Sequence, residues 1–163
     1  MTISAIGQDS HAFDFSQKEK KLTLGGVIFE DAPPLVANSD GDVVFHAITN
    51  AISGVSGKNI IGSVSDKMCL EEGIVDSSHY LKKAMATLGR DRVVHLSISI
   101  EAAVPNISPK INLMREAISK VVGISAKSVG ITATTGEGLT EFGRGRGIQA
   151  FCIVTVETRR KDK

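Results

Sequence analysis

Alternating apolar and polar residues predict β-strands in five segments of this chain. These segments are ISAIGQDSHAF (3–13), KLTLGGVIF (21–29), VVHLSISIEA (93–102), SVGITATT (128–135) and GIQAFCIVTVE (147–157). In the third segment, the alternation places Val94, Leu96, Ile98 and Ile100 on one face. The last segment is apolar on both faces around Phe151, Ile153 and Val154, which predicts a central strand or an interface.

Apolar residues at helical spacing predict three helices. The first has its stripe at Val44, Ile48, Ala51, Ile52 and Val55, after a capping box formed by Ser39 and Asp42. The second runs from about Ser77 to Leu88 and ends at Gly89. The third has Ser108 as its N-cap, Pro109 at its first position, a stripe at Ile111, Met114, Ile118 and Val121, and Gly123 beyond its end. Residues 56–76 show no clear period and predict a loop with one short helical turn at most.

The order of these elements favours an α+β fold. The strand–helix–strand run from Val93 to Thr134 predicts one βαβ unit, while the other strands are not regularly separated by helices. We therefore expect an α/β sandwich whose mixed sheet is covered by helices on one face, with subunit packing covering the other. The length predicts a single domain over residues 1–158, followed by a solvated charged tail at 159–163.

Composition excludes several classes of partner. The chain has 163 residues, 42% of them hydrophobic, and a net charge of +1 without a long basic stripe, so we expect no nucleic-acid partner. The sequence has no apolar run of bilayer length and no signal-peptide core, so we expect no membrane partner. The two cysteines, Cys69 and Cys152, lack metal or redox spacing, and Cys152 lies in an apolar strand. These features together predict a cytoplasmic protein.

Asp9, His11 and His46 form a candidate metal site. Asp9 and His11 are two positions apart on a predicted strand, so their side chains share a face, and His46 lies on the following helix. Three such ligands leave one tetrahedral position open, which is typical of catalytic zinc. The alternative is that Asp-x-His is a chance pattern and His46 a structural histidine.

A second candidate site is the turn TATTGEG (132–138), directly after a predicted strand. Hydroxyl and backbone N–H groups at a strand end suit a phosphate, and Glu137 would then require a divalent cation between itself and that phosphate. The alternative is a polar turn capped by threonines. Downstream, Arg144 and Arg146 in FGRGRG could meet an anionic ligand or form a flexible basic turn.

Taken as an ordered set, five motifs resemble one known family. GQDSHAF, LGGVIF, SDGDVVFHA, ITATTGEGL and FGRGRGI occur in the order and spacing of the 2-C-methyl-D-erythritol 2,4-cyclodiphosphate synthases of the non-mevalonate isoprenoid pathway. The resemblance covers nearly the whole chain. It implies a homotrimer with active sites between subunits, zinc on Asp9, His11 and His46, and Mg²⁺ or Mn²⁺ at Glu137. It also implies that the trimer core could hold an isoprenoid diphosphate.

The implied reaction is a metal-dependent cyclisation. The 2-phosphate of 4-diphosphocytidyl-2-C-methyl-D-erythritol 2-phosphate attacks the β-phosphorus and releases CMP, so the enzyme would be a phosphorus–oxygen lyase. The resemblance implies catalytic roles for Asn38, Thr135 and Glu137. It implies that substrate contacts come from Asn38, Ser39, Asp42, Gly62, Asp66, Ala102, Pro105, Asn106, Ala133, Thr134, Thr135 and Arg144.

The chain departs from the family pattern at several positions. Asn38 replaces a usual histidine, Asn50 and Asn106 replace a usual aspartate and lysine, and Arg146 replaces a glutamate. The family's Gly-Asp-Ile-Gly loop is here Asn-Ile-Ile-Gly at 59–62. Two alternatives therefore stay open at this stage. One is a degenerate, non-catalytic trimer that binds a nucleotide or an isoprenoid diphosphate, and the other is a metal-dependent phosphohydrolase.

Overall fold

The main sheet has four strands, and a computed structural model describes them together with the rest of residues 1–17 and 19–159. Their spatial order is β1 (Thr2–Ala12), β6 (Gly147–Glu157), β4 (Arg92–Glu101) and β5 (Val129–Thr134). β6 pairs antiparallel with both β1 and β4, whereas β4 and β5 are parallel. The predicted mixed sheet, its βαβ unit and the central position of the last strand are confirmed. Apart from Arg159, the predicted tail at 159–163 lies outside the described residues.

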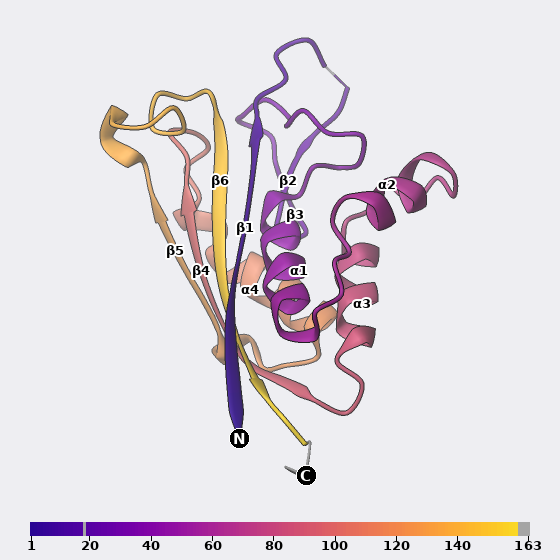
Figure 1. Cartoon of the computed structure of the whole chain (residues 1–163). Helices are drawn as coiled ribbons and strands as arrows, with labels where there is room; N and C mark the ends of the chain where they lie inside the picture. Colours follow the sequence, from indigo (N-terminus) through magenta and orange to yellow (C-terminus); the bar gives the residue numbers. More distant parts are fainter. Residues whose placement is uncertain (18, 160–163) are drawn as a thin grey trace.

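Helices cover one face of this sheet (Figure 1). They are α1 (Val43–Ser56), α2 (Ser63–Leu70), α3 (Ser78–Thr87) and α4 (Ile111–Val122), with short 3₁₀ helices at Ser108–Lys110, Ala126–Ser128 and Gly136–Gly138. α1 packs directly on β1 and β6, and α4 connects β4 to β5. No helix in the described ranges is long and apolar enough to cross a bilayer.

The core lies between the sheet and the helices. Alternate residues of the central strands point into it and are fully or almost fully buried, including Leu96, Ile98 and Ile100 of β4 and Ile148, Ala150, Cys152, Val154 and Val156 of β6. Ile48 and Ile52 of α1 and Met114 and Ile118 of α4 close the core from the other side. Burial raises the pKa of the Cys152 thiol to about 12, so this cysteine is an unreactive core residue.

The opposite face of the sheet is open in the single chain. Exposed apolar residues on this face include Ile6 at 64%, Phe151 at 39% and Ile153 at 47% of full exposure. Ile6 and Ile153 are directly paired across β1 and β6, and Phe151 is two residues away on the same face. Hydroxyl and amide side chains fill much of the remaining surface of these strands.

β1 and α1 approach each other closely because Gly7 has no side chain. A Cβ atom at Gly7 would lie 2.2 Å from Ala47 O and from Ala51 N, both in the backbone of α1. α1 begins at its N-cap, Asp42, whose side chain accepts hydrogen bonds from the N–H groups of Val44 and Phe45. The capping box predicted for Ser39 and Asp42 is therefore wrong, because Asp42 alone caps the helix.

Four other sequence predictions need correction. Ser108, predicted as the N-cap of the third helix, is instead the first residue of a 3₁₀ helix, and Lys110 is the N-cap of α4. Residues 21–29 form two short strands, β2 (Leu22–Leu24) and β3 (Val27–Phe29), because the chain reverses at Gly25–Gly26, where both glycines have positive φ. The stretch 56–76, predicted as a loop, contains the eight-residue helix α2. In β4 an irregularity between Val93 and His95 buries Val93 and exposes Val94, so Val94 does not share the face of Leu96.

Candidate functional site

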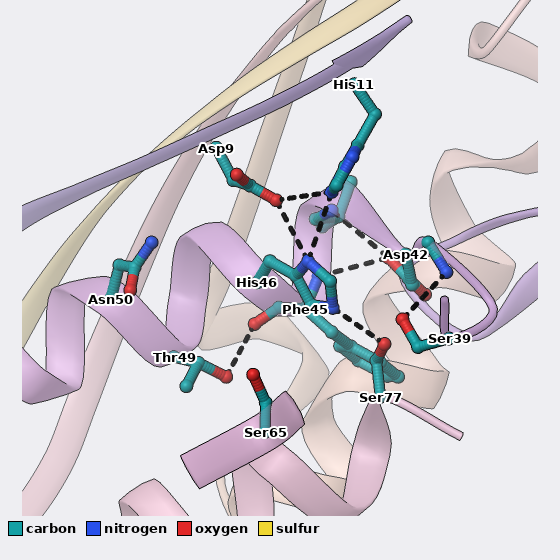
Figure 2. Close-up of polar contacts among 12 residues, drawn as sticks. Asp9, His11, Ser39, Asp42, Phe45, His46, Thr49, Asn50, Ser65 and Ser77 are labelled. Atoms are coloured by element: carbon teal, nitrogen blue, oxygen red, sulfur yellow. Dashed lines mark hydrogen bonds and ion pairs between the residues drawn. The ribbon is translucent and has the colours of Figure 1, made fainter. Parts of the chain in front are cut away.

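Asp9, His11 and His46 meet where β1 packs against α1 (Figure 2). Asp9 Oδ2 lies 2.9 Å from His46 Nδ1 and 3.0 Å from His11 Nε2, and the two imidazole nitrogens are 3.4 Å apart. All three ligand atoms lie within 4.8 Å of one another. The strand spacing that puts Asp9 and His11 on one face, combined with the close approach at Gly7, creates this cluster.

The environment of Asp9 favours its carboxylate form. Burial alone would raise the pKa of Asp9, but hydrogen bonds from His11 and His46 and the charge of these imidazoles outweigh it, so the pKa lies well below its usual value. His46 itself is 6% exposed, whereas the side chains of Asp9 and His11 are 20% and 22% exposed. The cluster is therefore anchored in the interior and open to solvent on one side.

This donor set fits a divalent cation. One carboxylate oxygen and two imidazole nitrogens are common ligands of zinc, and three protein ligands leave a coordination position for water or substrate. The predicted convergence of Asp9, His11 and His46 is confirmed, although the geometry does not specify which metal binds.

A pocket of about 250 Å³ adjoins the three residues. Four of the residues predicted to bind substrate line it, namely Asn38, Ser39, Gly62 and Asp66. Ile61, Ser65, Cys69 and Tyr80 complete much of the remaining wall. The stretch 59–66 thus contributes to the same pocket as the candidate metal ligands, through the start of α2.

A second pocket, of about 280 Å³, lies at the other edge of the sheet. Its lining includes the predicted residues Ala102, Pro105, Asn106, Ala133, Thr134 and Thr135. The threonine hydroxyls organise the turn that follows β5, because Thr134 Oγ1 accepts from Gly136 N at 3.2 Å and Thr135 Oγ1 from Glu137 N at 3.4 Å. Glu137 is exposed and has a φ of 49°, a left-handed conformation that is uncommon for a non-glycine residue.

Both pockets lie at the same level of the sheet. Asp9 pairs with Ala150 of β6, Ala150 with Ile100 of β4, and Ile100 with Ala133 of β5. Because neighbouring strands are about 4.8 Å apart, this row separates Asp9 from Ala133 by roughly 14 Å of sheet. One chain therefore carries two distinct groups of candidate residues, one at each edge.

Three predicted site residues are not among the residues that line either pocket in the described chain: Asp42, Glu137 and Arg144. Asp42 is fully buried, and besides capping α1 it accepts hydrogen bonds from the N–H groups of Gly25 and Gly26 at 2.8 and 2.7 Å. Arg144 pairs with Glu141 at 2.8 Å, and Arg146 pairs with the same glutamate at 3.0 Å. In this conformation both arginines therefore form ion pairs within the loop that precedes β6.

Sequence reasoning missed Ser77 and Asp40. His46 Nε2 lies 2.9 Å from Ser77 Oγ, and the Ser77 hydroxyl donates to Asp40 Oδ1. In the sequence Ser77 is simply a residue at the start of a predicted helix, and no local pattern links it to His46. Asn50, which stands where the family usually has an aspartate, donates to Gln8 O at 3.0 Å and ties α1 to β1.

Comparisons with known proteins give a family match and several relatives with similar sequences. A family model described as the YgbB family matches residues 2–157. A Chlamydia muridarum protein named 2-C-methyl-D-erythritol 2,4-cyclodiphosphate synthase is 52% identical over 152 residues, which are 93% of this chain and 85% of that protein. A Chlamydia felis protein of the same name is 50% identical over 152 residues, with coverages of 93% and 86%. The resemblance inferred from the sequence motifs is thereby confirmed.

Solved structures with the same fold include two with 26% identity. The structure titled as a CDP complex of IspF from Plasmodium falciparum has a TM-score of 0.83 and covers 98% of this chain and 97% of that one. The bifunctional IspDF of Campylobacter jejuni has a TM-score of 0.84 and covers 96% of this chain and 42% of that one.

Proposed function

The chain belongs to the YgbB family, and from this premise we propose that it cyclises 4-diphosphocytidyl-2-C-methyl-D-erythritol 2-phosphate to the 2,4-cyclodiphosphate with release of CMP. This reaction serves the synthesis of isoprenoid precursors. The observation that carries the proposal is the cluster of Asp9, His11 and His46 at the wall of a pocket.

The reaction requires little proton chemistry. An oxygen of the substrate's 2-phosphate forms a bond to the β-phosphorus, and the bond from that phosphorus to the oxygen of the CMP group breaks. The nucleophile is already an anion, so the protein chiefly has to fold the substrate and neutralise clustered negative charge. Asp9, His11 and His46 would hold a zinc ion, which would supply positive charge to the phosphate oxygens.

The metal-side pocket would hold the sugar and its phosphate. Asn38 would donate a neutral hydrogen bond to a phosphate oxygen, in place of the histidine usual at this position. Ser39, Gly62 and Asp66 would contact the methylerythritol hydroxyls, and their presence in the lining of this pocket supports that role.

The second pocket would hold the nucleotide. Thr134 and Thr135 would donate to the diphosphate, while Ala102, Pro105, Asn106 and Ala133 would surround the cytosine; all of them line this pocket. Glu137, directly after the threonines, would hold Mg²⁺ or Mn²⁺. Arg144 would reach the diphosphate only by leaving Glu141. For Asp42 the buried N-cap carboxylate supports a structural role in place of substrate contact.

These assignments favour a homotrimer with shared sites. The metal group and the threonine group lie at opposite edges of one sheet, so a second copy could bring its threonine edge to the metal edge of the first. The open sheet face with Ile6, Phe151 and Ile153 would then be buried between subunits. Both cysteines are free and buried, which fits a reducing compartment such as the cytoplasm.

Phosphorus NMR of the reaction products tests the proposed function. The purified protein, incubated with substrate, zinc and magnesium, should convert it to a cyclic diphosphate and CMP in equal amounts. Release of inorganic phosphate would identify a phosphohydrolase instead, and an unchanged spectrum under these conditions would contradict catalysis.

A further inference from the structure

His46 is held from both sides of its ring. Nδ1 faces Asp9 Oδ2 at 2.9 Å, while Nε2 faces Ser77 Oγ at 2.9 Å (Figure 2). Ser77 is fully buried and His46 nearly so. In such a setting a hydrogen bond is shielded from competing water, so the contact with Ser77 fixes the orientation of the ring.

The direction of the hydrogen bonds made by Ser77 determines which ring nitrogen of His46 carries the proton. The Ser77 hydroxyl donates to Asp40 Oδ1, because a carboxylate only accepts, and the Ser77 backbone N–H donates to Asp40 Oδ2 at 3.0 Å. A hydroxyl has a single proton, so Ser77 Oγ can meet His46 only as an acceptor. Nε2 must therefore carry the ring proton, and a neutral His46 presents the lone pair of Nδ1 to Asp9.

Asp40 is itself fixed by the backbone. Its Oδ1 also accepts from Asp42 N at 3.0 Å, and its own N–H donates to Val75 O at 2.9 Å. The carboxylate thus joins the segment before α1 to the segment before α3. The proton on the Ser77 hydroxyl has little freedom to turn toward His46.

This arrangement points two acceptors at one another across the cluster. A lone pair on His46 Nδ1 and an anionic Asp9 oxygen 2.9 Å away repel each other unless a positive charge lies between them. Without a metal ion, a second ring proton on Nδ1 supplies it and gives the hydrogen bond from His46 to Asp9 described above; a bound divalent cation would take the place of that proton. We propose that Ser77, held by Asp40, is a positioning residue that fixes His46 in the tautomer able to ligate a divalent cation through Nδ1. This inference rests on the proposed metal site of Asp9, His11 and His46.

Zinc binding by variants tests the inference without relying on turnover. The metal-free wild type and the Ser77→Ala variant would be titrated with zinc against a chromophoric chelator. Loss of a hydrogen bond that orients a ligating histidine typically lowers metal affinity 10–100-fold, and we expect a loss of about that size. Ser78→Ala is the matched control, because Ser78 is the next residue and lines a different groove, beside Phe45 and Ala117.

The outcomes separate the two proposals. If the wild type does not bind zinc, the metal site itself is wrong. If the wild type binds zinc and Ser77→Ala binds it equally tightly, the metal site stands and the positioning role of Ser77 is overturned. Circular dichroism would show whether each variant is folded.

A measurement on the wild type covers the case in which Ser77→Ala does not fold. Long-range ¹H–¹⁵N NMR of histidine-labelled, zinc-bound protein reports which ring nitrogen of His46 carries hydrogen. We expect a proton on Nε2 and a metal-bound Nδ1. A protonated Nδ1 would overturn the inference whatever the variants do.

Discussion

Substitution of Glu137 tests whether the turn after β5 contributes a metal ligand. Its side chain is exposed, so Glu137→Gln should leave the free energy of unfolding within about 0.5 kcal/mol of wild type. An amide is a poor substitute for a carboxylate as a magnesium ligand, and we expect kcat to fall roughly 100-fold. Steady-state kinetics over a range of magnesium concentrations would measure this. Glu116→Gln on α4 is the control, and equal turnover in the two variants would make Glu137 a turn residue only.

The raised pKa of Asp42 predicts that the free energy of unfolding depends on pH. Burial raises its pKa from 3.8 to about 6, and the charge of Asp40 adds to the shift although the N–H groups of Gly26, Phe45 and Gly25 oppose it. A raised folded-state pKa means that the folded protein binds the proton more tightly than the unfolded chain. The resulting stabilisation is complete below the unfolded pKa and is lost as pH rises through the folded pKa.

Urea unfolding of wild type and Asp42→Asn between pH 3.5 and 7 would measure that effect. We expect the stability of wild type relative to the variant to fall by roughly 1–3 kcal/mol across the window from about pH 4 to pH 6. A difference that stays constant with pH would show that folding does not shift the pKa of Asp42, and a difference that rises with pH would show that the folded-state pKa is lowered.

At the scale of elements, the packing of α1 on β1 sets the geometry of the proposed metal ligands. In Gly7→Ala the new methyl group would meet the backbone of Ala47 and Ala51 at 2.2 Å, so strand and helix must move apart. Asp9 would then separate from His46. We expect a loss of about 3 kcal/mol or more in the free energy of unfolding, together with weaker zinc binding.

Gly130→Ala is the matched control for Gly7→Ala. Gly130 lies on β5 in the same sheet, and a Cβ atom there would make an ordinary contact of 3.6 Å with Leu96 O. Chemical denaturation and chelator competition on both variants would measure stability and affinity. If Gly7→Ala and Gly130→Ala have the same stability and the same zinc affinity, the close approach at Gly7 does not determine the geometry of the metal site.

The long elements of this fold were predictable from sequence because each carries a clear local pattern. The four main strands, α1, α3 and α4 all follow from alternation or helical spacing, and Asp9 and His11 follow from the pattern of β1. The sequence did not reveal α2, which is short and only weakly amphipathic, or the irregularity that turns Val94 outward. The contact of Ser77 with His46 joins residues 31 positions apart, so no local pattern could predict it.

At the scale of the whole molecule, the shared site can be tested by mixing two inactive proteins. His11→Ala damages the metal edge and Glu137→Gln the threonine edge. Suppose that each site combines the metal edge of one subunit with the threonine edge of another. In random trimers formed from equal amounts of the two variants, about a quarter of all sites would then have both edges intact. Activity measured after joint refolding would test this, with each variant refolded alone as the control.

Sedimentation complements this experiment by giving the mass of the assembly. We expect a species of three times the chain mass of 17.3 kDa at micromolar concentration. Charged substitution of both Phe151 and Ile153 should shift it toward the monomer, since they lie on the open face of β6. Full recovery of activity by mixing that monomeric variant with either inactive protein would contradict the proposed arrangement.

If each active site is shared between subunits as proposed, the separation of the two pockets across one sheet also has a consequence for gene dosage. A newly made chain would carry both halves of the chemistry and yet be inert until it met other copies. Total enzyme activity would then rise more steeply than the protein concentration while the protein is scarce. It would become proportional to that concentration only once assembly is complete. In such a trimer, one chain damaged at both edges would inactivate two of the three active sites. A defective allele would therefore act dominantly.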